Sequence, residues 1–330
     1  MGSGAWSTDV YAAAASYRKH SGRSAFHYSD SVRHSSSRDS WKAHPGLDPH
    51  GVGTRESRDS DEHPTSLAIG VLFDVTGSMG RVPRTLQSKL PDLLGLLIRK
   101  GYVDDPQILF GAVGAATCDR VPLQIGQFES DNRMDDHLGN IFIESGGGGQ
   151  KTESYELALY FMARHTSIDC YDRRGKRGYL FLIGDEMPYR RVKRREVAAV
   201  IGDELSEDIP VEHIVAEAQR SYEVYYILPQ GASHAGDTEV LAAWRALLGQ
   251  NVIELDDLDA VCETIALTIG LAEDAIDLDE GLGHLRETGG DAPVDAVGKA
   301  LTAYARDRGT VVVSDGLPGL DDDPKGITRL

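Results

Sequence analysis

The sequence predicts an α/β fold: a doubly wound, mostly parallel six-stranded sheet with one antiparallel edge strand. From Leu67 to about residue 272, short apolar runs alternate with amphipathic stretches of helical length, which is typical of βαβ units. Most connections are long enough to return in parallel and to cover both faces of the sheet. One connection, near residue 120, is short enough for a hairpin, so it predicts the antiparallel strand.

The elements follow in order from these runs. LAIGVLF at 67–73 predicts a fully buried strand, and VPRTLQSKLPDLLGLLIRKG predicts a helix over 82–100, with Gly101 after its end. QILFGAVGAAT and VPLQIGQF predict the hairpin. Later segments predict, in turn, the helix ESYELALYFMARHT, the strands GYLFLIG and YEVYYIL, the helix DTEVLAAWRALLG, the strand NVIEL and the helix LDAVCETIALTIGLA.

Composition divides the chain into an arm at 1–65, the α/β domain at 66–272 and an acidic extension at 273–330. The arm is polar, rich in serine and histidine, and poor in apolar residues, so it does not form a core of its own. Two interpretations stay open: a flexible tail, or a docking arm with aromatic anchors. Those anchors are Trp6, Tyr11, Phe26, Tyr28 and Trp41.

The extension contains one helical pattern. PVDAVGKALTAYARD places Val294, Val297, Leu301 and Tyr304 on one face, so we expect this helix to pack on another element.

The charge balance limits the classes of partner. The 330 residues include 52 acidic and 34 basic side chains, for a net charge of -18, which disfavours binding to nucleic acid or anionic membranes. No apolar run is long enough to span a bilayer. The three cysteines, Cys118, Cys170 and Cys262, have no paired or metal-binding spacing, so we expect reduced thiols and a cytoplasmic location.

The first predicted strand ends in an unusual set of oxygens. In LAIGVLFDVTGSMG, Asp74, Thr76 and Ser78 follow the apolar run at alternate positions. Ligands of such sheets bind beyond the carboxyl ends of the strands, and an all-oxygen set suits a hard cation such as Mg²⁺. Taken alone, the same residues also suit a turn or a helix cap.

Two later segments favour the metal interpretation. ESGGGGQKTES delivers Thr152 just before a predicted helix, and YLFLIGDEMP ends another buried strand in Asp185. Both residues should lie at the same sheet edge as Asp74, and three loops converging there are harder to explain by capping.

In these residues and their spacing, the chain resembles a von Willebrand factor type A domain with a metal-ion-dependent adhesion site. The family's Asp-x-Ser-x-Ser motif is matched by Asp74, Thr76 and Ser78, with threonine in place of the first serine. The family's later threonine is best matched by Thr152, and its acid after the fourth strand by Asp185. The resemblance covers roughly residues 66–272.

This resemblance implies how the site works. Thr76 and Ser78 would bind Mg²⁺ directly, Asp74 and Asp185 largely through waters, and Thr152 directly or through water; Mn²⁺ and Ca²⁺ are alternative ions. An Asp or Glu of a protein partner would complete the coordination. Similar domains often work beside an AAA+ ATPase or within multi-protein complexes, so we expect an intracellular bacterial complex and no enzymatic activity.

The glycine-rich loop leaves its ligand open. Gln150 or Ser154 are alternatives to Thr152, because the loop has four glycines and is longer than the resemblance leads us to expect. The loop also resembles a phosphate-binding P-loop, but Ser145 and Gln150 occupy both fixed glycine positions, which argues against Lys151 as a nucleotide lysine.

A basic run, YRRVKRRE, follows Asp185 and is predicted to attract an acidic partner to the same rim. Its cationic residues are Arg190, Arg191, Lys193, Arg194 and Arg195. Two other functions remain as alternatives: a Mg²⁺-dependent phosphohydrolase or nucleotide-binding enzyme, and a scaffold subunit that acts through its arm and tail.

Overall fold

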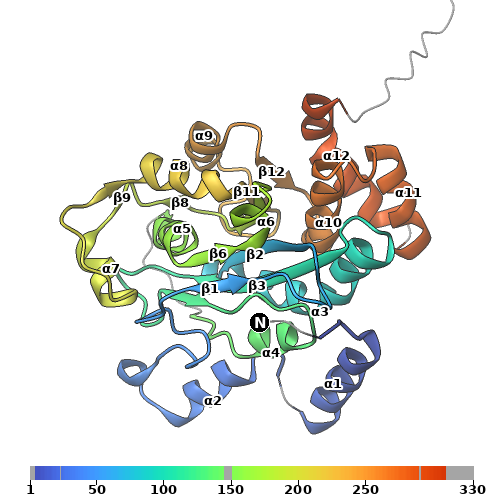
Figure 1. Cartoon of the computed structure of the whole chain (residues 1–330). Helices are drawn as coiled ribbons and strands as arrows, with labels where there is room; N and C mark the ends of the chain where they lie inside the picture. The colour runs from blue at the N-terminus through green and yellow to red at the C-terminus, as the bar shows by residue number, and fades with distance from the viewer. Residues whose placement is uncertain (1–3, 23, 145–150, 290, 310–330) are drawn as a thin grey trace, which may run out of the picture.

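A computed structural model describes residues 4–22, 24–144, 151–289 and 291–309. It has an α/β fold with one mixed six-stranded sheet and helices around it, so the predicted α/β class is confirmed (Figure 1). The core is continuous and is built largely from the apolar residues of the sheet strands and of the helices that cover them.

The main sheet has the strand order β12-β11-β7-β2-β3-β4. Neighbouring strands are parallel except for β3 and β4, which are antiparallel, as the short connection between them predicts. The strands are β2 (Ser66–Asp74), β3 (Asp105–Val113), β4 (Leu123–Ile125), β7 (Gly178–Ile183), β11 (Tyr222–Pro229) and β12 (Val252–Leu255).

The strand order reverses between β2 and β7. After β2 the chain adds β3 and β4 on one side, and it then returns to add β7, β11 and β12 on the other. Phe73 of β2 lies beside Ile183 of β7, so the two strands end side by side. Ligands of open α/β sheets bind at such reversal points, outside the carboxyl ends of the strands.

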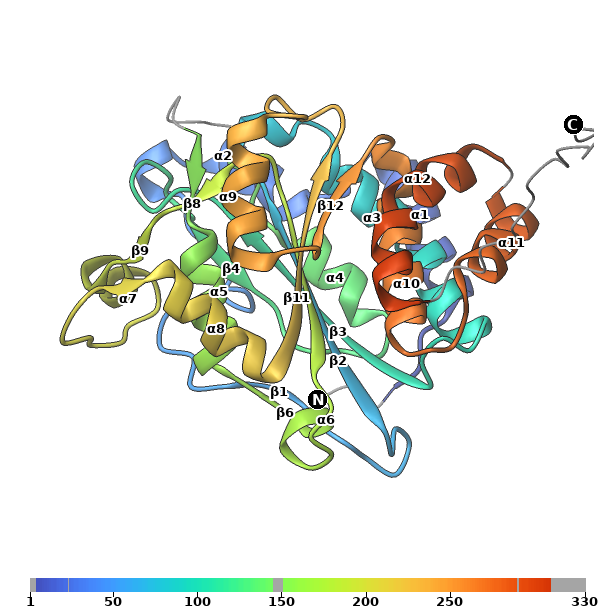
Figure 2. The same ribbon diagram turned by 90° about the horizontal axis from the view of Figure 1, so that it is seen from above.

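Helices flank the sheet on both sides: α5, α8 and α9 on one, α3, α10 and α12 on the other (Figure 2). The α-helices of the region after the arm are α3 (Val82–Leu94), α4 (Arg133–Gly139), α5 (Tyr155–Arg164), α6 (Asp169–Asp172), α7 (Arg194–Val200), α8 (Val211–Ser221), α9 (Thr238–Leu248), α10 (Val261–Ala272), α11 (Leu278–Gly289) and α12 (Asp291–Arg308). Short 3-10 turns are η1 (Arg38–Ser40), η2 (Gly77–Met79) and η4 (Leu258–Ala260).

Three two-stranded sheets were not predicted from the sequence. β1 (Arg55–Ser57) pairs with β6 (Thr166–Ile168), and β5 (Thr152–Glu153) pairs with β8 (Met187–Pro188), both in parallel. β9 (Arg191–Val192) pairs with β10 (Ile209–Pro210) in antiparallel fashion. These strands have two or three residues each, too short for a period to show in the sequence.

The helix predicted over 82–100 consists of two parts in the structure. It is α-helical to Leu94 and continues as a π-helix, η3 (Gly95–Arg99). Pro91 lies inside α3 and has no N–H, so the carbonyl of Gln87 loses its usual partner. The Tyr11 hydroxyl, from the arm, donates to that carbonyl at 2.9 Å.

The described part of the arm lies against the rest of the chain, which corresponds to the docking interpretation. It forms α1 (Thr8–Ser21), α2 (His27–Ser35) and β1. Phe26 and Tyr11 are buried, and Trp6 packs against the core from a partly buried position. The Trp41 ring lies 5.1 Å from that of Phe142. Tyr28 instead bonds within the arm, to the carbonyls of Lys42 and Ala43.

The extension also packs on the domain. The face predicted for α12 is buried: Val294, Val297, Leu301 and Tyr304 are each at most 5% exposed. The Tyr304 hydroxyl lies 2.8 Å from that of Tyr225 on β11. The three cysteines are free thiols. Within the described ranges, no helix is both long and apolar enough to cross a membrane.

Candidate metal centre

The candidate site begins where β2 ends. Asp74 is the last residue of this strand, and its side chain is fully buried. Its Oδ1 accepts the backbone N–H of Thr76 at 2.7 Å, and its Oδ2 lies 3.4 Å from the Tyr155 hydroxyl, which donates to it. Burial is the main reason why the pKa of Asp74 rises to about 8, and the nearby carboxyls of Asp185 and Glu186 raise it further.

The hydroxyls after Asp74 reach across to the neighbouring strand. Thr76 Oγ1 lies 3.1 Å from Ser78 Oγ, and Ser78 Oγ donates to Asp185 Oδ1 at 2.8 Å. Asp185 follows β7 and is fully buried. Gly80, at φ 51°, then turns the chain into α3 in a backbone conformation that side chains disfavour. The structure therefore brings the side chains of Thr76, Ser78 and Asp185 together.

A fourth loop completes this arrangement, and it was not predicted from the sequence. In the loop after β11, the backbone N–H of His234 donates to Asp185 Oδ2 at 2.9 Å, and that of Ser233 donates to the carbonyl of Ser78 at 3.1 Å. A signal was present, because β11 is another buried parallel strand whose carboxyl end meets the same sheet edge.

The third predicted loop reaches the site region through β5. Thr152 pairs with Met187, two residues after Asp185, and its hydroxyl has no hydrogen bond among the described residues. The alternative Ser154 accepts the backbone N–H of Ala116 at 2.9 Å, so its hydroxyl is already engaged. The other alternative, Gln150, lies outside the described residues.

Two further buried acids, Glu153 and Glu186, adjoin the centre. Glu153 is 2% exposed and Glu186 is 5% exposed. Burial, followed by the charges of Asp74 and the other glutamate, raises the pKa of Glu153 well above its usual range. Burial and Asp185 raise the pKa of Glu186 to about 7. So many carboxyls in one place disfavour full ionisation unless a cation is present.

The oxygen spacing fits a hard cation. Neighbouring oxygens around Mg²⁺ at its usual bond length lie about 2.9 Å apart, close to the 3.1 Å between the Thr76 and Ser78 hydroxyls. Without a metal, the same spacing lets these hydroxyls bond to each other. The described residues contain no group of three or more His, Cys, Asp or Glu side chains placed to hold a metal. The candidate centre therefore depends on its hydroxyls.

The basic run lies elsewhere than predicted. Its residues occupy the β9–β10 ribbon and the start of α7, which lies at the side of the molecule beside α8 (Figure 1). Arg191 and Arg194 bond to Asp208, and Lys193 and Arg195 pair with Glu196. In the described part of the chain, no contact joins these four residues or Arg190 to the hydroxyls of the candidate site.

Lys151 is engaged by α9. Its Nζ lies 2.6 Å from Asp237 Oδ2 and 3.8 Å from Glu239 Oε2, at the start of that helix. Two carboxylates therefore already neutralise the Lys151 ammonium, which a bound phosphate would need as its counter-charge.

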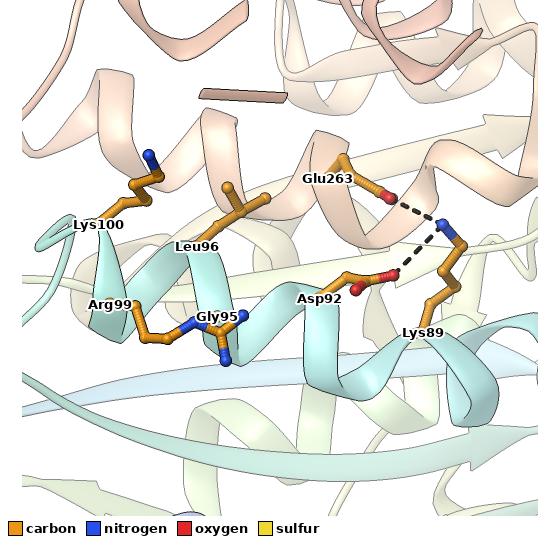
Figure 3. Close-up of a pocket in the computed structure, with 7 residues that line it drawn as sticks. All are labelled: Lys89, Asp92, Gly95, Leu96, Arg99, Lys100 and Glu263. Carbon is orange, nitrogen blue, oxygen red and sulfur yellow. Dashed lines mark hydrogen bonds and ion pairs between the residues drawn. The ribbon is translucent and has the colours of Figure 1, made fainter. Parts of the chain in front are cut away.

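A separate cavity of about 220 Å³ lies between α3, the π-helix and α10 (Figure 3). Lys89 on α3 reaches Glu263 on α10 at 2.9 Å and Asp92 at 3.3 Å. Glu263 is 5% exposed, so removing Lys89 would leave a buried charge without compensation. This cluster ties α10 to α3, and it lies apart from the candidate site.

Comparison with known proteins gives only distant similarities. No family model matches the chain, and no curated protein matches it. Among solved structures, the pilus adhesin SpaC from Lactobacillus rhamnosus GG aligns at 11% identity and a TM-score of 0.46 over 66% of this chain. Proximal thread matrix protein 1 from the mussel byssus aligns at 10% identity and a TM-score of 0.39 over 63%. The chain spans 31% of the first and 46% of the second.

Proposed function

We propose that this chain is a von Willebrand factor A-type module that binds Mg²⁺ and, through it, an acidic side chain of a protein partner. The observation that carries the proposal is the array of Thr76, Ser78 and Asp185, joined by contacts of 3.1 and 2.8 Å across the ends of two neighbouring strands. It lies where the strand order reverses, the usual ligand position in such sheets.

The strand order supports the finer assignment of the fold. Numbered along the chain, the strands of the main sheet run 3-2-1-4-5-6, the order of doubly wound Rossmann-type sheets. The third strand is the antiparallel one, as the family resemblance implies. We therefore assign residues 66–272 to a doubly wound domain of this type, with the arm and the extension as additions.

The residues of the site have distinct tasks. The Ser78 hydroxyl donates a hydrogen bond to Asp185, so the lone pairs of its oxygen stay available to a cation. Asp74 holds the loop in place by accepting a hydrogen bond from the backbone N–H of Thr76. Neutral hydroxyl ligands leave much of the ion's charge uncancelled, so a bound Mg²⁺ would supply an open position for a partner's Asp or Glu. Mn²⁺ or Ca²⁺ would serve in the same way.

Burial of Asp74 favours binding over phosphoryl chemistry. An aspartyl phosphatase needs a carboxylate that can reach phosphorus, but Asp74 is 0% exposed and both its oxygens accept hydrogen bonds. Lys151, the P-loop lysine of the alternative nucleotide-binding function, is paired with acids. A non-catalytic module is therefore the simpler proposal, with a cytoplasmic complex, for instance beside an AAA+ ATPase, as its setting.

Capture of a partner from native lysate tests this function. The immobilised protein should retain a partner in Mg²⁺ and release it in EDTA, because chelation removes the ion that joins the two surfaces. The Ser78→Ala variant should capture nothing in either condition. Ser88→Ala removes a hydroxyl from α3 that bonds only to the carbonyl of Thr85, so it is the matched control.

Other outcomes would favour the alternatives. Capture that persists in EDTA and in Ser78→Ala, but is lost when residues 1–65 are removed, would favour the scaffold. Mg²⁺-dependent phosphate release from a generic phosphatase substrate would favour the enzyme.

A further inference from the structure

A cleft lies beside the loop at residues 74–80, which we call the metal loop, and between helix α2 of the arm and the start of α3. Its volume is about 210 Å³. Residues of the arm, the metal loop, α3 and the segment after α4 all contribute to its wall, among them Ser29, Asp30, Arg33, Gly80, Arg84 and Ile143.

The arm side of this cleft is firmly held. The Arg33 guanidinium donates through Nη2 to the carbonyls of Ile143 and Glu144, the second at 2.6 Å. It also lies over the rings of Trp41 and Phe142, at 4.7 and 5.2 Å from their centroids. These contacts use neutral groups, so they fix the guanidinium in place without neutralising its charge.

A second arginine faces the cleft from α3. Arg84 is exposed, and its guanidinium has no hydrogen bond or ion pair among the described residues. Asp30 is the acidic residue of the wall, so the lining side chains carry two positive charges and one negative charge. The cleft therefore carries a net positive charge in a chain whose net charge is -18.

The cleft is close to the candidate metal ligands. Gly80 belongs to its wall and follows Ser78 by two residues, so their Cα atoms are at most about 7.6 Å apart. An extended peptide advances about 3.3 Å per residue, and one or two residues would therefore separate a side chain at the metal from a side chain in the cleft.

We propose that this cleft is a subsite for a second carboxylate of the partner, bound by Arg33 and Arg84 while the first carboxylate completes the metal's coordination. This inference rests on the proposed function, and it narrows the partner to a segment with two acidic residues close in sequence. Arginine suits the task because its planar guanidinium matches a carboxylate in geometry.

Random peptides displayed on phage test the subsite. The full-length protein is immobilised in Mg²⁺, and bound phage are eluted with EDTA. We expect the eluted peptides to share two acidic residues a short distance apart. In solution, replacing the second acid of such a peptide by its amide should weaken binding to the wild type by about three- to tenfold, the usual size of a charge-assisted contact near a surface.

Variants of the cleft residues test whether this loss of affinity arises in the cleft. Arg84→Ala should prefer the two-acid form less than the wild type does, because only Arg33 remains to bind the second acid, whereas Asp30→Asn should increase that preference. Arg81→Ala is the matched control, because Arg81 is a neighbouring exposed arginine that is not part of the cleft wall and lies 4.0 Å from Asp259. It should behave as the wild type.

The possible failures are distinguishable. If EDTA elutes no specific peptides, the proposed metal-dependent function is wrong, and the subsite falls with it. If EDTA-sensitive peptides bind the wild type equally well with one acid or two, the metal-dependent function stands and the subsite is wrong. An equal loss in wild type and in Arg84→Ala would place the second contact elsewhere and would also contradict the subsite.

Discussion

Ser78→Ala and Asp185→Asn are expected to abolish Mg²⁺-dependent capture of the partner while the protein stays folded. At the proposed site, Ser78 would contribute a ligand oxygen, and Asp185 would contribute a negative charge besides accepting the hydrogen bond of the Ser78 hydroxyl. We prefer asparagine to alanine at 185, because the side chain is fully buried and also accepts the N–H of His234. Alanine would leave that N–H unpaired, at a cost of about 1–3 kcal/mol.

The control for this prediction is Thr76→Ser. It keeps the hydroxyl that lies 3.1 Å from Ser78, so capture should persist. Circular dichroism and thermal unfolding check that each variant is folded. Folded Ser78→Ala and Asp185→Asn proteins that still capture the partner, and still release it in EDTA, would show that the metal lies elsewhere.

Asp74→Asn is expected to have opposite effects on stability and on metal binding. In the metal-free protein, the asparagine oxygen can still accept the Thr76 N–H, and its amide can donate to the Tyr155 hydroxyl. The variant no longer has a carboxyl that burial makes costly to ionise. Its free energy of unfolding at neutral pH should therefore rise by about 1–3 kcal/mol, whereas Mg²⁺ should no longer stabilise it.

The sign of the pH dependence follows from the pKa of Asp74. Because this pKa rises to about 8 in the folded chain, the folded state binds more protons than the unfolded state between the ordinary carboxyl pKa and about 8. The contribution of Asp74 to stability therefore falls as pH rises through this window, and it is constant above it. The difference between Asp74→Asn and wild type should grow over the same window.

Urea unfolding at several pH values, with and without Mg²⁺, measures both effects. Asp61→Asn, at an exposed position of the arm, is the control and should leave the unfolding curve unchanged. An Asp74→Asn protein that is less stable than wild type in EDTA would contradict this account of the buried carboxyl.

The sequence predicts the sheet well because each buried strand is a separate apolar run. The positions of Asp74 and Asp185 follow from this, since each comes at or just after the end of such a run and parallel strands share one edge. The apolar run of β11 also places the following loop at this edge, but it does not indicate that the backbone N–H groups of Ser233 and His234 bond to Ser78 and Asp185, because backbone donors are independent of residue type.

The contacts between the arm and the α/β domain could also not be predicted from patterns in the sequence. Pro91 indicates that one carbonyl of α3 loses its partner, but only the structure shows that Tyr11 supplies the replacement. The position of the basic run was also not predictable, because this run follows Asp185 closely in sequence but does not lie beside it in the structure. It lies instead on the β9–β10 ribbon and at the start of α7, where Lys193 and Arg195 pair with Glu196.

Titration of the metal-free chain with Mn²⁺, followed by electron paramagnetic resonance, tests the central claim most directly. Mn²⁺ prefers oxygen ligands as Mg²⁺ does, and its spectrum reports the bound and the free ion separately. We expect about one bound ion per chain that Mg²⁺ displaces, and no binding in Ser78→Ala. Equal binding by the wild type and Ser78→Ala, or none by either, would contradict the claim that the Thr76 and Ser78 hydroxyls form a metal centre.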